Sequence, residues 1–97
     1  MKVLRKVFEF EWDEGNRDKN KKHNVKDKEA EEVFFDENKT IQKDNLHSKN
    51  EDRFIALGRT RKGRLLYVVF TKRGKKIRII SARDINKKEV KFYEEAT

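Results

Sequence analysis

Residues 54–81 decide the fold, and their sequence is FIALGRTRKGRLLYVVFTKRGKKIRIIS. Three runs rich in β-branched, aromatic and other large apolar residues, 54–60, 65–71 and 77–81, each have the length of a strand. The two connections between them are charged and contain Gly63 and Gly74, where a tight turn needs positive φ. The stretch therefore predicts two consecutive hairpins, which form an antiparallel meander of three strands.

The middle run differs from the other two because it is apolar on both faces. Large apolar side chains occupy every position from Leu65 to Phe70. A strand that is apolar on both sides is covered on both sides. We therefore expect this strand at the centre of the sheet.

The N-terminal part predicts one more strand and two helices. Residues 3–12 alternate, with large apolar side chains on one face interrupted by Lys6, which is typical of a strand. A polar helix over 14–23 is expected next, with Asp13 as N-cap and Asn24 as the left-handed residue that ends it. Apolar residues at i, i+3 and i+4 then predict a short helix over 26–35.

The remaining segments complete an α+β architecture. Residues 36–52 are polar and predict either a long loop or a ragged edge strand. Ser81 and Asp84 resemble a capping box, and apolar stripes from Ile85 to Tyr93 predict a C-terminal helix. We expect a single domain over 1–97 with the order β-α-α-β-β-β-α, in which an antiparallel sheet of about four strands packs with these three helices.

The composition excludes several classes of function. No apolar run approaches the roughly 18 residues of a membrane span, and the charged N-terminus does not resemble a signal peptide, so we expect a cytoplasmic protein without membrane contact. The chain has no cysteine and only two histidines, His23 and His47, without companions at metal-ligand spacing. We therefore expect no metal site and no cofactor, while the net charge of +8 favours a polyanionic partner.

The positive charge is concentrated in the C-terminal half. From Arg53 to Lys88 there are thirteen lysines and arginines and one acid, Asp84, whereas acids are in excess elsewhere. The cations of the two turns either blunt edge strands or form a rim that binds phosphates, which we favour. The residues predicted to contact RNA, including two lysines of the last helix, are Arg61, Lys62, Arg64, Lys72, Arg73, Lys75, Lys76, Lys87 and Lys88.

Three arginines differ from those of the turns. Arg59, Arg78 and Arg83 lie within or at the end of apolar strands, where a charge is costly unless it has a role. Because side chains alternate along a strand, one face of the sheet could present several guanidinium groups together. They are candidates for the catalytic site, although pairing with Glu89 or another acid would explain them equally well.

RNA cleavage without a metal requires groups that move protons as well as cations. The reaction activates a 2′-hydroxyl, stabilises negative charge at phosphorus and protonates the leaving oxygen. Glu89 and Tyr93 are further catalytic candidates because at i, i+4 they share one face of the last helix. A mechanism that uses His23 and His47 is a weaker alternative, since His23 suits a helix end and His47 lies in the polar segment.

Several of these segments together resemble one known family. They are Phe10-Glu11-Trp12-Asp13, Asn20-Lys21-Lys22-His23, Glu29-Ala30-Glu31-Glu32-Val33-Phe34 and Ile79-Ile80-Ser81-Ala82-Arg83, followed by Lys87-Lys88-Glu89. In combination they resemble the BrnT family over nearly the whole chain, most weakly between residues 36 and 51. The chain departs from the family pattern at Asn24, where a glycine is usual, and at Ile85, where an alanine is usual.

The resemblance implies a function. BrnT proteins are toxins of type II toxin-antitoxin systems, with a RelE-like fold and a ribonuclease activity that blocks translation. It also implies an antitoxin partner resembling BrnA, contact with operator DNA only through that partner, and RNA as substrate, and it leaves open a dimer within the complex. The basic surface alone would equally support a non-catalytic RNA- or DNA-binding module, or a regulator that binds only an acidic protein.

Overall fold

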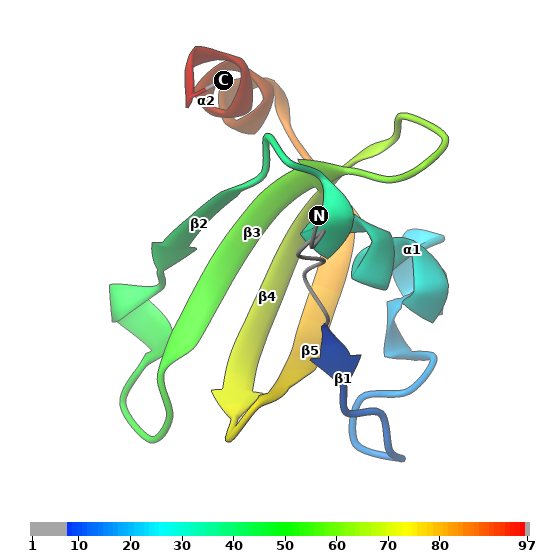
Figure 1. Ribbon diagram of the computed structural model, residues 1–97, viewed down its shortest axis with the longest axis vertical. Helices are drawn as coiled ribbons and strands as arrows, with labels where there is room; N and C mark the ends of the chain where they lie inside the picture. Colours follow the sequence, from blue (N-terminus) through cyan, green and yellow to red (C-terminus); the bar gives the residue numbers. More distant parts are fainter. Residues whose placement is uncertain (1–7, 97) are drawn as a thin grey trace, which may run out of the picture.

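The structure is a computed structural model that describes residues 8–96. It is an α+β fold built on a five-stranded mixed sheet with the order β1-β5-β4-β3-β2 (Figure 1). The strands are β1 (Glu9–Phe10), β2 (Thr40–Lys43), β3 (Arg53–Arg59), β4 (Leu65–Arg73) and β5 (Lys76–Asp84). The helices are α1 (Asp27–Glu32) and α2 (Lys87–Ala96), with 3₁₀ turns η1 (Lys19–His23), η2 (Val33–Phe35) and η3 (Asn45–His47).

The predicted meander is present, and β4 lies at its centre. Strand β3 pairs antiparallel with β4, and β4 pairs antiparallel with β5. Gly63 and Gly74 adopt positive φ values of 86° and 61° in the two turns, which a residue with a side chain rarely adopts. The prediction from residues 54–81 is therefore confirmed.

The sheet has one more strand than predicted, and it is mixed rather than antiparallel. The segment 36–52 contains an edge strand, β2, which pairs antiparallel with β3. At the other edge, β1 runs parallel to β5. The strand predicted over 3–12 is confirmed at Glu9 and Phe10, whereas Phe8, Glu11 and Trp12 are not part of a strand. The predicted residues 3–7 lie outside the described part of the chain.

The helix predicted over 14–23 is wrong, because this segment follows the outer edge of β5. The buried amide of Asn16 donates to the carbonyl of Ile79 at 3.0 Å, and the side-chain oxygen of Asn20 accepts the amide hydrogen of Ala82 at 2.9 Å. These two side chains pair backbone groups of β5 that the short β1 does not reach. Only η1 is helical here, and Asn24 ends it in the left-handed region, as predicted.

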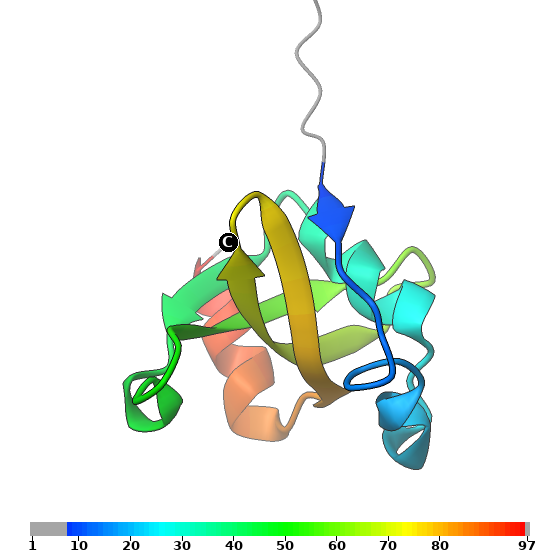
Figure 2. The ribbon, with the colours of Figure 1, turned by 90° about the horizontal axis from the view of Figure 1, so that it is seen from below.

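The two faces of the sheet are covered by different parts of the chain. Figure 2 shows the N-terminal segments and α1 on one side of the sheet and α2 on the other. The larger core lies beneath α1 and η2, where Phe34 packs edge-to-face against Phe70 at 4.9 Å between ring centroids. The helix predicted over 26–35 corresponds to α1 together with η2.

The C-terminal helix is present, but its N-cap differs from the prediction. Strand β5 continues through Ser81 to Asp84, so these residues do not form the cap. Asn86 caps α2 instead: its side chain accepts the amide hydrogen of Glu89, whose carboxylate accepts that of Asn86, both at 2.9 Å. Tyr93 anchors the helix in the second core, with Ile55 and Leu57 of β3. In the described part of the chain no helix is long and apolar enough to cross a membrane.

Candidate active site

The sheet divides the basic residues between its two ends. The β3–β4 turn and the β4–β5 turn lie at opposite ends of β4 (Figure 1). Arg59 pairs with Leu65 at one end, whereas Arg78 pairs with Thr71 near the other. Their partners on β4, Leu65 and Thr71, are six residues apart, which is roughly 20 Å along the strand. The arginines of the strands therefore do not form a single cluster.

Arg83 is paired with a carboxylate at the α2 end of the sheet. Its guanidinium group donates two parallel hydrogen bonds to the carboxylate of Glu89, at 2.9 and 2.8 Å. It also stacks over the ring of Tyr67 at 3.9 Å from the centroid. An arginine held by a fork and by an aromatic face is pre-oriented. Its side chain is 39% exposed, so an anion from solution can reach it.

The surroundings keep both members of this pair charged. The hydrogen bonds to Glu89 raise the pKa of Arg83, against a smaller opposing effect of burial. Burial raises the pKa of Glu89, but the bonds from Arg83 and from the Asn86 amide outweigh it, so the pKa lies below its ordinary value. Glu89 is thus ionised at neutral pH.

Arg59 and Tyr93 form a second group. Arg59 lies on β3 and Arg83 on β5, the two strands that flank β4. The guanidinium carbon of Arg59 lies 5.7 Å from the centroid of the Tyr93 ring, and its side chain donates to the carbonyl of Gly63. Tyr93 is 3% exposed, and its hydroxyl donates to Asp36 at 2.7 Å. Burial and this bond raise the pKa of Tyr93. Asp36 also accepts the amide hydrogen of Arg59, at 2.8 Å.

Arg78 is bound by two carboxylates near the far end of β4. Its guanidinium group donates to both carboxylate oxygens of Asp13, at 2.8 and 3.0 Å, and to Glu11 at 3.2 Å. The Asp13 bonds raise its pKa, and the side chain is only 13% exposed. Arg73 also donates to Glu11, at 3.1 Å. Arg78 thus joins β5 to the segment that follows β1.

The side chain of Arg64, like that of Arg78, is held by hydrogen bonds within the protein. It donates to both oxygens of Asp84, at 2.7 and 3.1 Å, and to the carbonyl of Asn24 at 2.7 Å. Weaker contacts reach Glu29 and the carbonyl of His23. The bonds to Asp84 are the largest contribution to its raised pKa. Arg64 therefore connects the β3–β4 turn with η1, α1 and the end of β5.

The other cations predicted to contact RNA are exposed. Within residues 8–96 their side chains form no ion pairs, which leaves their charge available to a ligand. Arg61, Lys62, Lys87 and Lys88 lie at the α2 end, and Lys72, Lys75 and Lys76 at the far end.

The histidines are not brought together. His23 lies at the end of η1, near Arg64, whereas His47 lies in η3, where its ring pairs with Asp44 at 2.9 Å. These positions belong to opposite ends of the sheet, so the geometry does not favour the two-histidine alternative. Across residues 8–96 no three histidine or acidic side chains gather as they would around a metal ion.

Two residues of these groups were not predicted. Tyr67 was not among the predicted site residues; it lies on the same face of β4 as Leu65 and Val69, partly buried against the second core. Asp36 is 57 residues from Tyr93 in sequence, and no local pattern indicates their contact. The pairing of β4 with β5 would have identified Tyr67, because it aligns this residue with Arg83.

Comparisons with known proteins identify the family. The family model described as "Ribonuclease toxin, BrnT, of type II toxin-antitoxin system" matches residues 12–89. This range includes Arg59, Arg83 and Glu89 and ends before Tyr93. A comparison with curated proteins gave no match. Since the model covers most of the 97 residues, the chain belongs to the BrnT family of ribonuclease toxins of type II toxin-antitoxin systems.

Proposed function

We propose that this toxin is a metal-independent endoribonuclease that blocks translation by cutting RNA, with Arg83 and Glu89 at its catalytic centre. The observation that carries the proposal is the forked pair of Arg83 and Glu89, which is stacked on Tyr67 and partly exposed. It supplies an oriented cation and an ionised carboxylate at one place. Arg59, on the other side of β4, provides a second cation.

The proposed reaction is attack of a 2′-hydroxyl on the adjacent phosphorus. A phosphate of the RNA competes with Glu89 for the guanidinium of Arg83, and the carboxylate is released to accept the 2′-hydroxyl proton. The new 2′-oxygen–phosphorus bond replaces the bond to the 5′-oxygen, which takes up one proton from water as it leaves, and Glu89 returns the proton it accepted to the solvent. The products are a 2′,3′-cyclic phosphate and a 5′-hydroxyl. Arg83 and Arg59 neutralise the charge that develops at phosphorus.

Two of the other predicted residues receive different roles in this proposal. The Tyr93 hydroxyl is buried and donates to Asp36, so we assign it to the docking of α2. Arg78 is held by Asp13 and Glu11, and we assign it to stability. The exposed lysines and arginines of both turns and of α2 bind the RNA backbone.

The proposal extends to the wider setting of the toxin. We propose a single domain over residues 1–97 with a RelE-like arrangement, active in the cytoplasm. A BrnA-like antitoxin neutralises the toxin, and the complex contacts operator DNA through the antitoxin, with a dimer as one form of the complex. These proposals rest on the family match.

The test is cleavage of an end-labelled RNA by the purified toxin in the presence of EDTA. We expect cleavage that EDTA does not reduce, and fragments that end in a 2′,3′-cyclic phosphate. Loss of cleavage in EDTA, with recovery on addition of Mg²⁺, would contradict the metal-independent mechanism. A toxin that binds RNA and leaves it intact, with or without ribosomes, would instead be a non-catalytic binding module. The observation that favours this alternative is that Arg83 and Glu89 are bonded to each other.

A further inference from the structure

Phe35 is an aromatic side chain that the fold leaves at the surface. It is 59% exposed at the end of η2, next to fully buried Phe34. Its ring is held edge-to-face by Phe8, with a centroid distance of 5.1 Å and an interplanar angle of 88°. An exposed ring that is held in place by a neighbouring ring provides a fixed surface for a flat group.

Phe35 lines a small hollow between α1 and the β3–β4 turn. The hollow has a volume of about 130 Å³, and its other lining residues are Lys28, Glu31, Glu32 and Arg61. This is below the roughly 300 Å³ of an ordinary small-molecule site. Its size therefore suits one flat group of a longer ligand rather than an enclosed small molecule.

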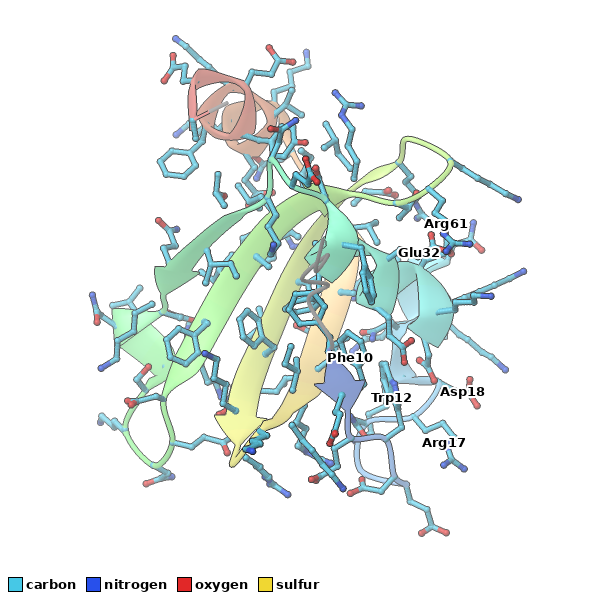
Figure 3. The ribbon with its side chains drawn as sticks, in the orientation of Figure 1. Phe10, Trp12, Arg17, Asp18, Glu32 and Arg61 are labelled. Atoms are coloured by element: carbon cyan, nitrogen blue, oxygen red, sulfur yellow. The ribbon has the colours of Figure 1, made fainter. Side chains whose placement is uncertain are left out.

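Two carboxylates and two cations line the hollow, and their side chains differ in their contacts. Glu31 accepts the indole hydrogen of Trp12 at 2.6 Å, and Glu32 accepts the amide hydrogen of Arg61 at 3.1 Å. Figure 3 shows Glu32 and Arg61 side by side where the turn meets α1. By contrast, the side chains of Lys28 and Arg61 form no ion pair with any residue in the range 8–96.

The hollow is continuous with the proposed catalytic end of the sheet. A second, more open hollow shares Glu32, Phe35 and Arg61 with the first and extends to Asp36, Arg59 and Thr60. A chain that occupies both hollows passes from Phe35 to Arg59. The charged lining of the second hollow consists of two exposed cations, Arg59 and Arg61, and the half-buried carboxylates of Glu32 and Asp36.

We propose that Phe35 stacks against a base of single-stranded RNA, while Arg61 and Lys28 bind the flanking phosphates. Aromatic side chains among cations are the usual platform for single-stranded nucleic acid, because every base has a face that can stack. The inference rests on the proposed function, since it extends the path of the RNA beyond Arg59. It assigns a binding subsite for the substrate, separate from Arg83 and Glu89.

The test measures binding rather than cleavage, so that it is independent of the ribonuclease proposal. The probe is a fluorescein-labelled eight-nucleotide 2′-O-methyl RNA, which cannot be cleaved because its 2′-oxygens carry no hydrogen. Fluorescence anisotropy gives its Kd for the full-length toxin and for Phe35→Ala, Phe35→Leu, Phe35→Trp and Phe92→Ala. Phe92 is the matched control, because it is an aromatic residue of α2 with 49% exposure. Circular dichroism checks that each variant is folded.

We expect Phe35→Ala and Phe35→Leu to weaken binding by roughly 5- to 150-fold, the range for loss of one stacked base. Phe35→Trp and Phe92→Ala should bind as the wild type does. A series of probes with one abasic nucleotide at each position in turn adds a second readout. At the stacked position the missing base should weaken binding to the wild type and leave binding to Phe35→Ala unchanged.

Three results would overturn the inference. The first is equal affinity of Phe35→Ala and Phe92→Ala, and the second is an equal abasic penalty in wild type and Phe35→Ala at every position. The third is a Phe35→Ala variant that keeps its RNA affinity but loses the antitoxin, which would make the ring a protein contact. A wild type that binds the probe and cuts no RNA would refute the ribonuclease proposal and leave the subsite intact.

Discussion

Replacement of Arg64 by leucine should destabilise the toxin although the residue lies in a charged surface turn. The fork to Asp84 is partly solvated, because the Asp84 side chain is 65% exposed, so we count it at about 1 kcal/mol. The short bond to the Asn24 carbonyl adds about 1 kcal/mol. The expected loss of unfolding free energy is about 2 kcal/mol, which lowers Tm by roughly 8 to 16 °C in a domain of this size.

Thermal unfolding followed by circular dichroism measures this loss, with Arg61→Leu as the control. Arg61 lies in the same turn, but its side chain forms no ion pair in the described part of the chain, so we expect a change within about 0.5 kcal/mol. Arg64→Leu melting within about 3 °C of the wild type would refute the assignment of Arg64 to structure, since the expected shift is several degrees per kcal/mol.

The same variant should alter how stability depends on pH. The hydrogen bond from Arg64 lowers the pKa of Asp84 below 3.8. A lowered carboxyl pKa stabilises the fold at pH values above 3.8, and this contribution disappears as the pH falls through the pKa of the folded state. The difference in unfolding free energy between wild type and Arg64→Leu should therefore shrink as the pH is lowered from 6 to below 3. A difference that stays constant in denaturant titrations over this range would contradict the role of Asp84.

Tyr93→Phe should lower the unfolding free energy by about 1 kcal/mol, because it removes the hydrogen bond to Asp36. RNA cleavage by this variant should stay within about threefold of the wild type. A large loss of cleavage at unchanged stability would make Tyr93 a proton donor. Gly58→Ala should destabilise the toxin by about 1 to 3 kcal/mol in a urea titration, because the new Cβ would lie 2.8 Å from Cγ1 of Val33 and 3.1 Å from its carbonyl oxygen. A wild-type midpoint would contradict this packing. Asn20→Ala should cost about 1 to 3 kcal/mol, because it leaves a buried amide of β5 without an acceptor, and a smaller change in the same titration would show that water replaces the side chain.

The central hairpins could be predicted because their signals are local. Alternation, apolar runs and glycine turns lie within residues 54–81, and the structure confirms strands and turns there. The helix over 14–23 was wrong because helical signals in a polar segment are weak, and the buried contacts of Asn16 and Asn20 with β5 override them. Contacts across more than 60 residues leave no local pattern.

The candidate site was likewise predictable where the signal is local and unpredictable where it depends on contacts between distant residues. That arginines in apolar strands have special environments could be expected from sequence, and Arg83 and Arg78 each have a forked carboxylate partner. The sequence could not distinguish them, because the difference depends on which partner each finds and how exposed it remains. Only the register of the strands shows that Arg59 and Arg83 flank β4 near one end while Arg78 lies nearer the other.

The most direct test of the account is single-turnover cleavage of a labelled RNA by Arg83→Ala and by Arg78→Ala, at a temperature where both variants are folded. Each change removes an arginine of β5 that is forked to a carboxylate. We predict that Arg83→Ala lowers the rate about 100- to 1,000-fold, the usual effect of removing one group that stabilises a developing charge. Arg78→Ala should stay within about threefold of the wild type, since a residue that acts only on stability does not change the rate of a folded enzyme. Equal losses in both variants, or a larger loss in Arg78→Ala, would contradict the placement of the chemistry at Arg83.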